Sequence, residues 1–112
     1  LQFEVEGTLE DLPAAVEVAV YRIVMEAVHN VKKHARATQC SVTLIREPTQ
    51  LSIEIQDDGM GFEETYGSGL GLHSIRERAE ELGGRAQVRA IKLRGTLVSV
   101  ALPIKEWRSS NQ

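Results

Sequence analysis

The sequence predicts an α+β fold: a two-layer α/β sandwich with helices packed on one face of a mixed, mostly antiparallel sheet. Two observations lead to this prediction. Strand-like segments occur in pairs joined by short turns, which is typical of antiparallel hairpins. Segments with apolar residues at helical spacing separate the strands, giving the order strand, helix, two strands, helix, two strands. Elements in this order form a sheet that helices cover.

The first half of the chain contains the longer predicted helix. Residues 3–6 alternate like a short strand that Gly7 ends, and Pro13 suits the first turn of a helix. Apolar residues then recur at threes and fours as far as Ala35. Because valine is a mediocre helix former, we expect this helix to depend on burial against the sheet. The apolar residues are Val16, Val20, Ile23, Ala27, Val28 and Val31.

A predicted hairpin follows the helix. Residues 40–47 are rich in β-branched residues, residues 48–50 form a turn, and residues 51–56 alternate cleanly. The alternation places Leu51, Ile53 and Ile55 on the core side of the sheet. Residues 58–70 are rich in glycine and are predicted to be irregular.

A second helix and a second strand pair complete the predicted domain. The helix is expected over about residues 70–82, where apolar residues have helical spacing and Gly83-Gly84 provides a stop. The strands are expected over 88–93 and 97–102. Residues 1–104 therefore form one expected domain, and residues 105–112 a polar C-terminal tail.

Composition excludes several classes of function. The 112 residues carry a net charge of −3 with acids and bases interspersed, so neither a nucleic-acid partner nor a direct membrane contact is expected. The single cysteine, Cys40, excludes an internal disulfide and is predicted to be a core residue. The chain begins with Leu1 rather than Met, so we expect it to be a piece of a longer protein.

The first predicted helix carries three polar residues in one sector: Glu26, Asn30 and Lys33. The neutral Asn30 carbonyl suits Mg²⁺, which takes hard oxygen ligands and keeps several waters. Lys33 could help to neutralise phosphates, and Glu26 could accept a proton from a water or hydroxyl. For any one of the three taken alone, a solvated helical face is the simpler interpretation. His34 lies nearer the apolar sector, where a packing role is the simpler interpretation.

Two glycine-rich segments follow this helix in the chain. Asp57 ends a predicted strand just before Gly59 and Gly61. A carboxylate only accepts hydrogen bonds, so it would select the exocyclic amine of adenine over the carbonyl of guanine. Residues 67–72 precede a helix, and the amides of such a loop form an anion site suited to phosphates. A plain turn and a flexible hinge are the alternative interpretations of these two segments.

Together, these motifs resemble those of the GHKL superfamily, the ATP-binding (Bergerat) fold that histidine kinases share with DNA gyrase. Residues 26–35 resemble its N-box, 57–62 its first glycine box and 67–72 its second, while Gly95-Thr96 resembles the threonine before its last strand. The chain is most similar to the catalytic domain of NarL/DesK-like sensor histidine kinases. That similarity rests on Asn-x-x-Lys-His-Ala, the short lid between the glycine boxes and Arg-Glu-Arg at 76–78.

This resemblance implies roles for individual residues. Asn30 would ligate Mg²⁺, Lys33 would contact phosphate, and His34 would approach the nucleotide. Asp57 would bind the adenine amine, partly through a water held with Thr96. The base pocket would be lined by Gly59 and Gly61. The nucleotide-binding lid would include Gly67, Gly69, Leu70, Gly71 and Leu72. Glu26 corresponds to the general base of ATP-hydrolysing relatives, whereas in kinases the surroundings of the acceptor usually have that role.

The resemblance also implies a function. The chain would be the ATP-binding catalytic domain of a two-component sensor histidine kinase, using ATP and Mg²⁺ and delivering the γ-phosphoryl group to a histidine on a dimerisation domain. That dimerisation domain is not among these residues, since His29, His34 and His73 lie inside or beside the ATP motifs. We therefore expect a monomer that binds ATP without autophosphorylation.

The partners expected from this resemblance are the dimerisation domain and a downstream response regulator, on the cytoplasmic side of a parent protein that can be membrane-anchored. Two other functions share this fold. One is a stand-alone serine kinase of the anti-sigma-factor type, and the other is a non-catalytic ATP-binding or partner-docking module.

Overall fold

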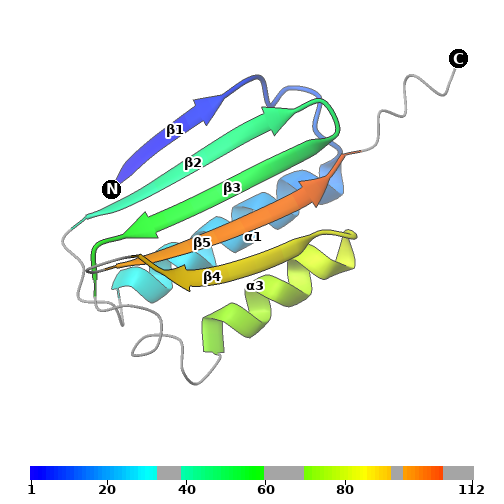
Figure 1. The fold of residues 1–112 in the computed structure, drawn as a ribbon. Helices are drawn as coiled ribbons and strands as arrows, with labels where there is room; N and C mark the ends of the chain where they lie inside the picture. The colour runs from blue at the N-terminus through cyan, green and yellow to red at the C-terminus, as the bar shows by residue number, and fades with distance from the viewer. Residues whose placement is uncertain (33–38, 60–69, 92–94, 105–112) are drawn as a thin grey trace, which may run out of the picture.

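The computed structural model describes residues 1–32, 39–59, 70–91 and 95–104. Within these residues, one five-stranded sheet is covered on one face by two helices (Figure 1). The predicted two-layer α+β fold is therefore confirmed. In chain order the elements are β1 (Gln2–Glu6), α1 (Ala14–Asn30), β2 (Cys40–Glu47), β3 (Gln50–Asp57), α3 (Leu70–Glu81), β4 (Arg85–Ala90) and β5 (Thr96–Pro103).

The strands follow the order β1-β2-β3-β5-β4 across the sheet. β1 is parallel to β2, and the other three pairs are antiparallel, so the sheet is mixed and mostly antiparallel as predicted. The parallel pair follows from the chain order, because α1 lies between β1 and β2 and carries the chain back across one face of the sheet. The short turn between β2 and β3 makes that pair antiparallel.

The core lies between the sheet and the helix layer. Leu51, Ile53 and Ile55 on β3 are at most 1% exposed, as their alternation predicted. From the other side, α3 contributes Ile75 and Ala79, both fully buried. The buried stripe of α1 consists of Val16, Ala19, Ile23, Ala27 and Asn30. The valine-rich helix therefore packs against the sheet, and this burial compensates for its modest helix propensity.

A pair of glycines ends α3. Gly83 has a φ of +81°, and its N–H donates to the carbonyl of Glu80 over 3.0 Å. The N–H of Gly84 donates to the carbonyl of Ala79 over 2.8 Å. These two bonds form a Schellman motif, which confirms the predicted stop. A Cβ on Gly84 would lie 2.0 Å from the carbonyl oxygen of Ala101, so the chain meets the sheet directly after the helix.

The fourth strand lies earlier in the chain than predicted. β4 spans Arg85–Ala90, not 88–93. Its first half alternates arginine and glutamine with alanine, which have weak strand propensity, so the pattern gave little sign of a strand there. Directly after β4, the N–H of Ile91 donates to the carbonyl of Gly95, the residue before β5, over 3.0 Å.

Several predicted boundaries fall outside the described residues. α1 runs to Asn30, and residues 31–32 continue it in a wider π-type turn, but the rest of the predicted helix up to Ala35 is not described. The predicted irregular segment is described only at residues 58–59 and 70, and the predicted tail at 105–112 is not described. In the part of the chain that is described, neither helix is long and apolar enough to cross a membrane.

Candidate functional site

The buried end of β3 carries the first candidate residue, Asp57. Its side chain is 4% exposed and lies on the core-facing side of the strand. Its Oδ1 accepts a hydrogen bond of 2.7 Å from the backbone N–H of Gly59. Burial raises the pKa of the Asp57 carboxyl, the Gly59 bond lowers it, and the nearby Asp58 charge raises it further. This carboxylate is therefore desolvated and suited to a ligand that donates a hydrogen bond.

Thr96 lies directly opposite Asp57 on the neighbouring strand β5. It is fully buried, and its hydroxyl has no hydrogen-bond partner within the described residues. On the other side of Asp57, Cys40 of β2 occupies the paired position. Because paired residues share one face of a sheet, Cys40, Asp57 and Thr96 form a row on the core-facing side at this end of the sheet. The row combines a desolvated acceptor with a hydroxyl that can both donate and accept.

Cys40 matches its predicted packing role more closely than a reactive one. It is partly buried and packs against the hydrophobic core. Burial raises the pKa of its thiol, and the charge of Asp57 adds to that effect. A thiol whose pKa is raised carries less thiolate at neutral pH, so it is a weaker nucleophile than a free cysteine.

The backbone around this row is closely packed. Gly95 has a φ of +109°, and a Cβ at that position would lie 2.2 Å from the carbonyl oxygen of Asp57. Asp58 bonds Gln39 twice: its Oδ1 accepts the Gln39 N–H over 3.0 Å, and its N–H donates to the Gln39 carbonyl over 3.3 Å. Gly95 therefore lies directly against the end of β3, and the two Asp58 bonds tie the residue after β3 to the residue before β2. An open hollow of about 320 Å³ lies beside them, partly lined by Cys40, Asp57 and Asp58.

Asn30 lies at the C-terminal end of α1 and is 6% exposed. Its Nδ2 donates to no acceptor among the described residues. Since a buried amide without partners destabilises the folded protein, this side chain is better explained by a ligand or an ordered water than by the surface position that the sequence left open. Figure 1 places this end of α1 beside the end of β3, the start of β5 and the start of α3.

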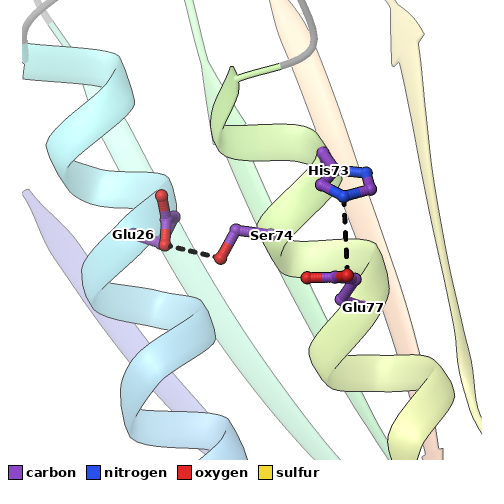
Figure 2. A network of polar contacts seen from close by, with 4 residues as sticks. All are labelled: Glu26, His73, Ser74 and Glu77. Carbon is purple, nitrogen blue, oxygen red and sulfur yellow. Dashed lines mark hydrogen bonds and ion pairs between the residues drawn. The ribbon is translucent and has the colours of Figure 1, made fainter.

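Glu26 lies one turn before Asn30 and contacts the other helix. Its Oε1 accepts a hydrogen bond of 3.1 Å from the hydroxyl of Ser74 on α3 (Figure 2). The sequence analysis did not select Ser74. A serine one turn into the helix after a glycine-rich segment was a usable signal, but it pointed to no partner. His29 and His73 are exposed, and His73 pairs with Glu77 at 3.5 Å on the same helix.

The remaining predicted site residues are only partly described. Leu70, Gly71 and Leu72 form the start of α3, so the second glycine segment leads directly into that helix. Lys33, His34, Gly61, Gly67 and Gly69 lie outside the described residues. The structure therefore brings together Asp57, Gly59 and Thr96, and it places Asn30 and Glu26 on the helix that ends beside them.

Comparison with known proteins agrees with this arrangement. The family described as "Histidine kinase-, DNA gyrase B-, and HSP90-like ATPase" matches residues 15–106. The chain belongs to this family. The resemblance to the GHKL superfamily is thus confirmed, and ATP is the nucleotide that this family of domains binds.

Similar sequences include sensor histidine kinases of bacteria. The chain is 36% identical over 105 residues to the sensor histidine kinase LiaS of Bacillus subtilis (strain 168), covering 90% of this chain and 29% of LiaS. It is 35% identical over 107 residues to the signal transduction histidine-protein kinase/phosphatase DegS of Brevibacillus brevis, covering 93% of this chain and 28% of DegS. The chain thus spans less than a third of the length of these relatives.

Solved structures show the same fold. The histidine kinase domain of the Erythrobacter litoralis EL346 blue-light activated histidine kinase superposes with a TM-score of 0.69 at 24% identity, covering 96% of this chain and 54% of that one. The catalytic domain of the histidine kinase ThkA superposes with a TM-score of 0.65 at 18% identity, covering 92% of this chain and 79% of that one. At these identities the similarity establishes the fold and not individual residue roles.

Proposed function

We propose that these residues form the Mg²⁺-dependent ATP-binding catalytic domain of a two-component sensor histidine kinase. The observation that supports this most directly is the buried pair of Asp57 and Thr96 in register at the end of the sheet, with few protein partners for either side chain. The relatives named above are sensor histidine kinases, which favours this function over a serine kinase or a non-catalytic module.

The base end of the site would recognise adenine. Asp57 would accept a hydrogen bond from the exocyclic amine, and the Thr96 hydroxyl would hold a water or a ring nitrogen beside it. Gly59 already donates its N–H to Asp57, which keeps one carboxylate oxygen engaged and leaves the other for the ligand. Gly61, with no side chain, would let the backbone approach the flat face of the base.

The phosphate end would lie between α1 and α3. The Asn30 carbonyl oxygen would hold Mg²⁺, and the ion would neutralise the charge of the phosphates. Asn30 fits this role because its carbonyl oxygen is neutral and adds no negative charge beside the phosphates, while its buried and unpartnered Nδ2 would donate to a phosphate oxygen or a water. Lys33, His34 and the amides of Gly67, Gly69, Leu70, Gly71 and Leu72 would contact the nucleotide, since the N-terminus of α3 favours anions.

The proposed reaction is phosphoryl transfer to a histidine on a dimerisation domain. A ring nitrogen of that histidine attacks the γ-phosphorus, a P–N bond forms, and the bond to the bridging oxygen breaks with ADP as the leaving group. Phosphoryl transfer depends mainly on positioning and on charge neutralisation, which the residues above would supply. A response regulator would then receive the phosphoryl group, on the cytoplasmic side where ATP is available.

Isothermal titration calorimetry with MgATP tests the proposal. Replacing Asp57 by Asn places an amine donor where the acceptor was, so we expect the affinity to fall by roughly 30-fold or more. Glu54→Gln is the matched control, because Glu54 is on the same strand but exposed, and it should bind like the wild type. Unchanged affinity in the Asp57→Asn variant would reject the assignment of the adenine site.

A radiolabelling assay separates a kinase from a non-catalytic module. A full-length kinase that contains these residues should transfer the γ-phosphoryl group of ATP to one of its histidines, giving a product that is labile in acid and stable in base. The Asp57→Asn variant should form little of this product at the same ATP concentration. ATP binding without any histidine phosphorylation in the wild type would favour the binding-module interpretation.

A further inference from the structure

One polar contact joins the two helices beside the site. The hydroxyl of Ser74 on α3 donates to Oε1 of Glu26 on α1, and both side chains are partly buried (Figure 2). The two residues are 48 positions apart in the chain, so the bond forms only when α1 and α3 are packed together. A hydrogen bond to a carboxylate is among the stronger side-chain contacts, particularly when solvent reaches it poorly.

The position of this bond connects it to the nucleotide site. Glu26 precedes Asn30 by one helical turn on α1. Ser74 lies one turn after Leu70, where α3 begins and the second glycine segment ends. The bond therefore joins the two helices one turn before the proposed metal ligand on α1 and one turn after the proposed phosphate cradle begins α3.

The neighbours of Ser74 on α3 have different roles. Ile75 is fully buried and anchors the helix in the core. His73 projects away from α1 and pairs with Glu77, and the side chains of that pair are 76% and 63% exposed (Figure 2). Because an exposed pair of this kind contributes little to stability, the His73–Glu77 contact provides an internal comparison for the Ser74–Glu26 contact.

We propose that Ser74 is a positioning residue for the metal and phosphate end of the site. By holding the Glu26 carboxylate, its hydroxyl keeps the start of α3 aligned with the end of α1, so that Asn30 and the amides at the start of α3 meet the same triphosphate. The base end does not depend on this bond, because Asp57 and Thr96 are fixed by strand pairing. This inference rests on the proposed function.

Comparing two ligands tests the inference. Ser74→Ala should weaken MgATP binding about fivefold, the size expected for losing one partly exposed side-chain hydrogen bond of about 1 kcal/mol. Adenosine, which has the base and no phosphates, should bind this variant as it binds the wild type. Glu77→Ala removes the exposed pair on the same helix and should leave both affinities unchanged. Equal weakening for both ligands, or no weakening for MgATP, overturns the inference.

A pair of variants of equal shape controls for packing. Ser74→Thr keeps the hydroxyl. Ser74→Val lacks it, but valine has nearly the same volume and branching as threonine. We expect the threonine variant to bind MgATP within about twofold of the wild type and the valine variant to resemble Ser74→Ala. Equal MgATP affinities for the threonine and valine variants contradict a role for the hydroxyl, even if Ser74→Ala folds poorly.

A double-mutant cycle identifies the partner. If Ser74 acts through Glu26, the variant with both Ser74→Ala and Glu26→Ala should bind MgATP no more weakly than Glu26→Ala alone. Additive losses would show that Ser74 acts elsewhere. The Asp57→Asn variant separates this inference from the proposed function. If Asp57→Asn weakens MgATP binding while Ser74→Ala and Ser74→Val both bind MgATP with wild-type affinity, only the proposed role of Ser74 is contradicted. A wild-type chain that binds no MgATP contradicts both.

Discussion

The two ends of the candidate site are built in different ways. At the base end, Asp57 and Thr96 are paired on neighbouring strands, fully or almost fully buried, and packed against the turn at Gly95. At the phosphate end, Glu26 and Ser74 meet through one side-chain hydrogen bond between two helices and remain partly exposed. The first end is fixed by backbone ladders, and the second by the packing of two helices and a single polar contact.

This difference suggests that the two ends of the site would bind different parts of the nucleotide. Recognition of a flat base needs a fixed acceptor in a desolvated place, and a strand end within a sheet supplies it. In the proposed function, phosphates and a metal ion would bind together and leave after transfer, so their site can use helix ends that adjust. Variants at the base end should therefore change stability or base recognition, and variants at the phosphate end should change the metal-dependent part of binding.

Gly95→Ala should produce the largest loss of stability. An alanine there would need a φ near +109°, and its Cβ would lie 2.2 Å from the carbonyl oxygen of Asp57, which is backbone and cannot move aside. We expect the free energy of unfolding to fall by about 3 kcal/mol in urea denaturation. Gly83→Ala is the control: its φ is +81°, but the nearest atom is Pro103 Cγ at 3.7 Å, so about 1 kcal/mol is expected. Equal losses would show that backbone strain alone, and not the close approach, matters at Gly95.

Asn30→Ala should have a smaller effect that depends on magnesium. We expect MgATP to bind about tenfold more weakly, because the metal loses a protein oxygen ligand. In EDTA, the variant and the wild type should bind ATP alike. The fold should persist, because the Asn30 Nδ2 donates to no described residue and its removal therefore leaves no acceptor there without a partner. A loss of the same size with and without magnesium would remove Asn30 from the metal site.

The smallest predicted effect is a pH-dependent gain of stability in the unliganded Asp57→Asn variant. Burial raises the pKa of Asp57 above its ordinary value of 3.8, so the folded chain holds that proton more tightly than the unfolded chain. The resulting stabilisation of the wild type is complete below that value and is lost as the pH rises through the folded-state pKa. At neutral pH the variant should therefore unfold at equal or higher urea concentration, and its advantage should shrink as the pH falls. An advantage that grows on acidification would contradict a raised pKa.

Much of the fold could be predicted because buried faces of strands and helices require apolar residues at regular spacings in the sequence. Residues 40–47 have the predicted bounds of β2, and β3 extends the predicted strand by one residue at each end, because their alternation is bounded by turns. The position of β1 beside β2 could not be predicted, because β1 is exposed along its whole length and no residue in it specifies a neighbour. Once the two strands are neighbours, the crossover through α1 makes the pair parallel. β4 was misplaced because its first half contains arginine, glutamine and alanine in place of β-branched residues.

A candidate site residue could be selected from the sequence where its side-chain chemistry allows few roles. The position of Asp57 at the end of a strand and before a glycine predicted an acceptor facing a ligand; the structure shows that this side chain is buried, and its role stays a prediction. Asn30 could not be distinguished from a solvated residue, because burial at a helix end depends on what packs against it. Ser74 was missed because its partner lies 48 residues away, and a local pattern does not encode that contact.

The central claim is that the base end of the site selects adenine through Asp57. Titrating the wild-type chain with ATP and with inosine triphosphate tests it directly, because inosine carries a carbonyl in place of the exocyclic amine and a proton on the neighbouring ring nitrogen. We predict that the wild type prefers ATP by at least about tenfold, and that Asp57→Asn loses this preference. Equal affinities in the wild type, or an unchanged preference in the variant, would contradict the claim.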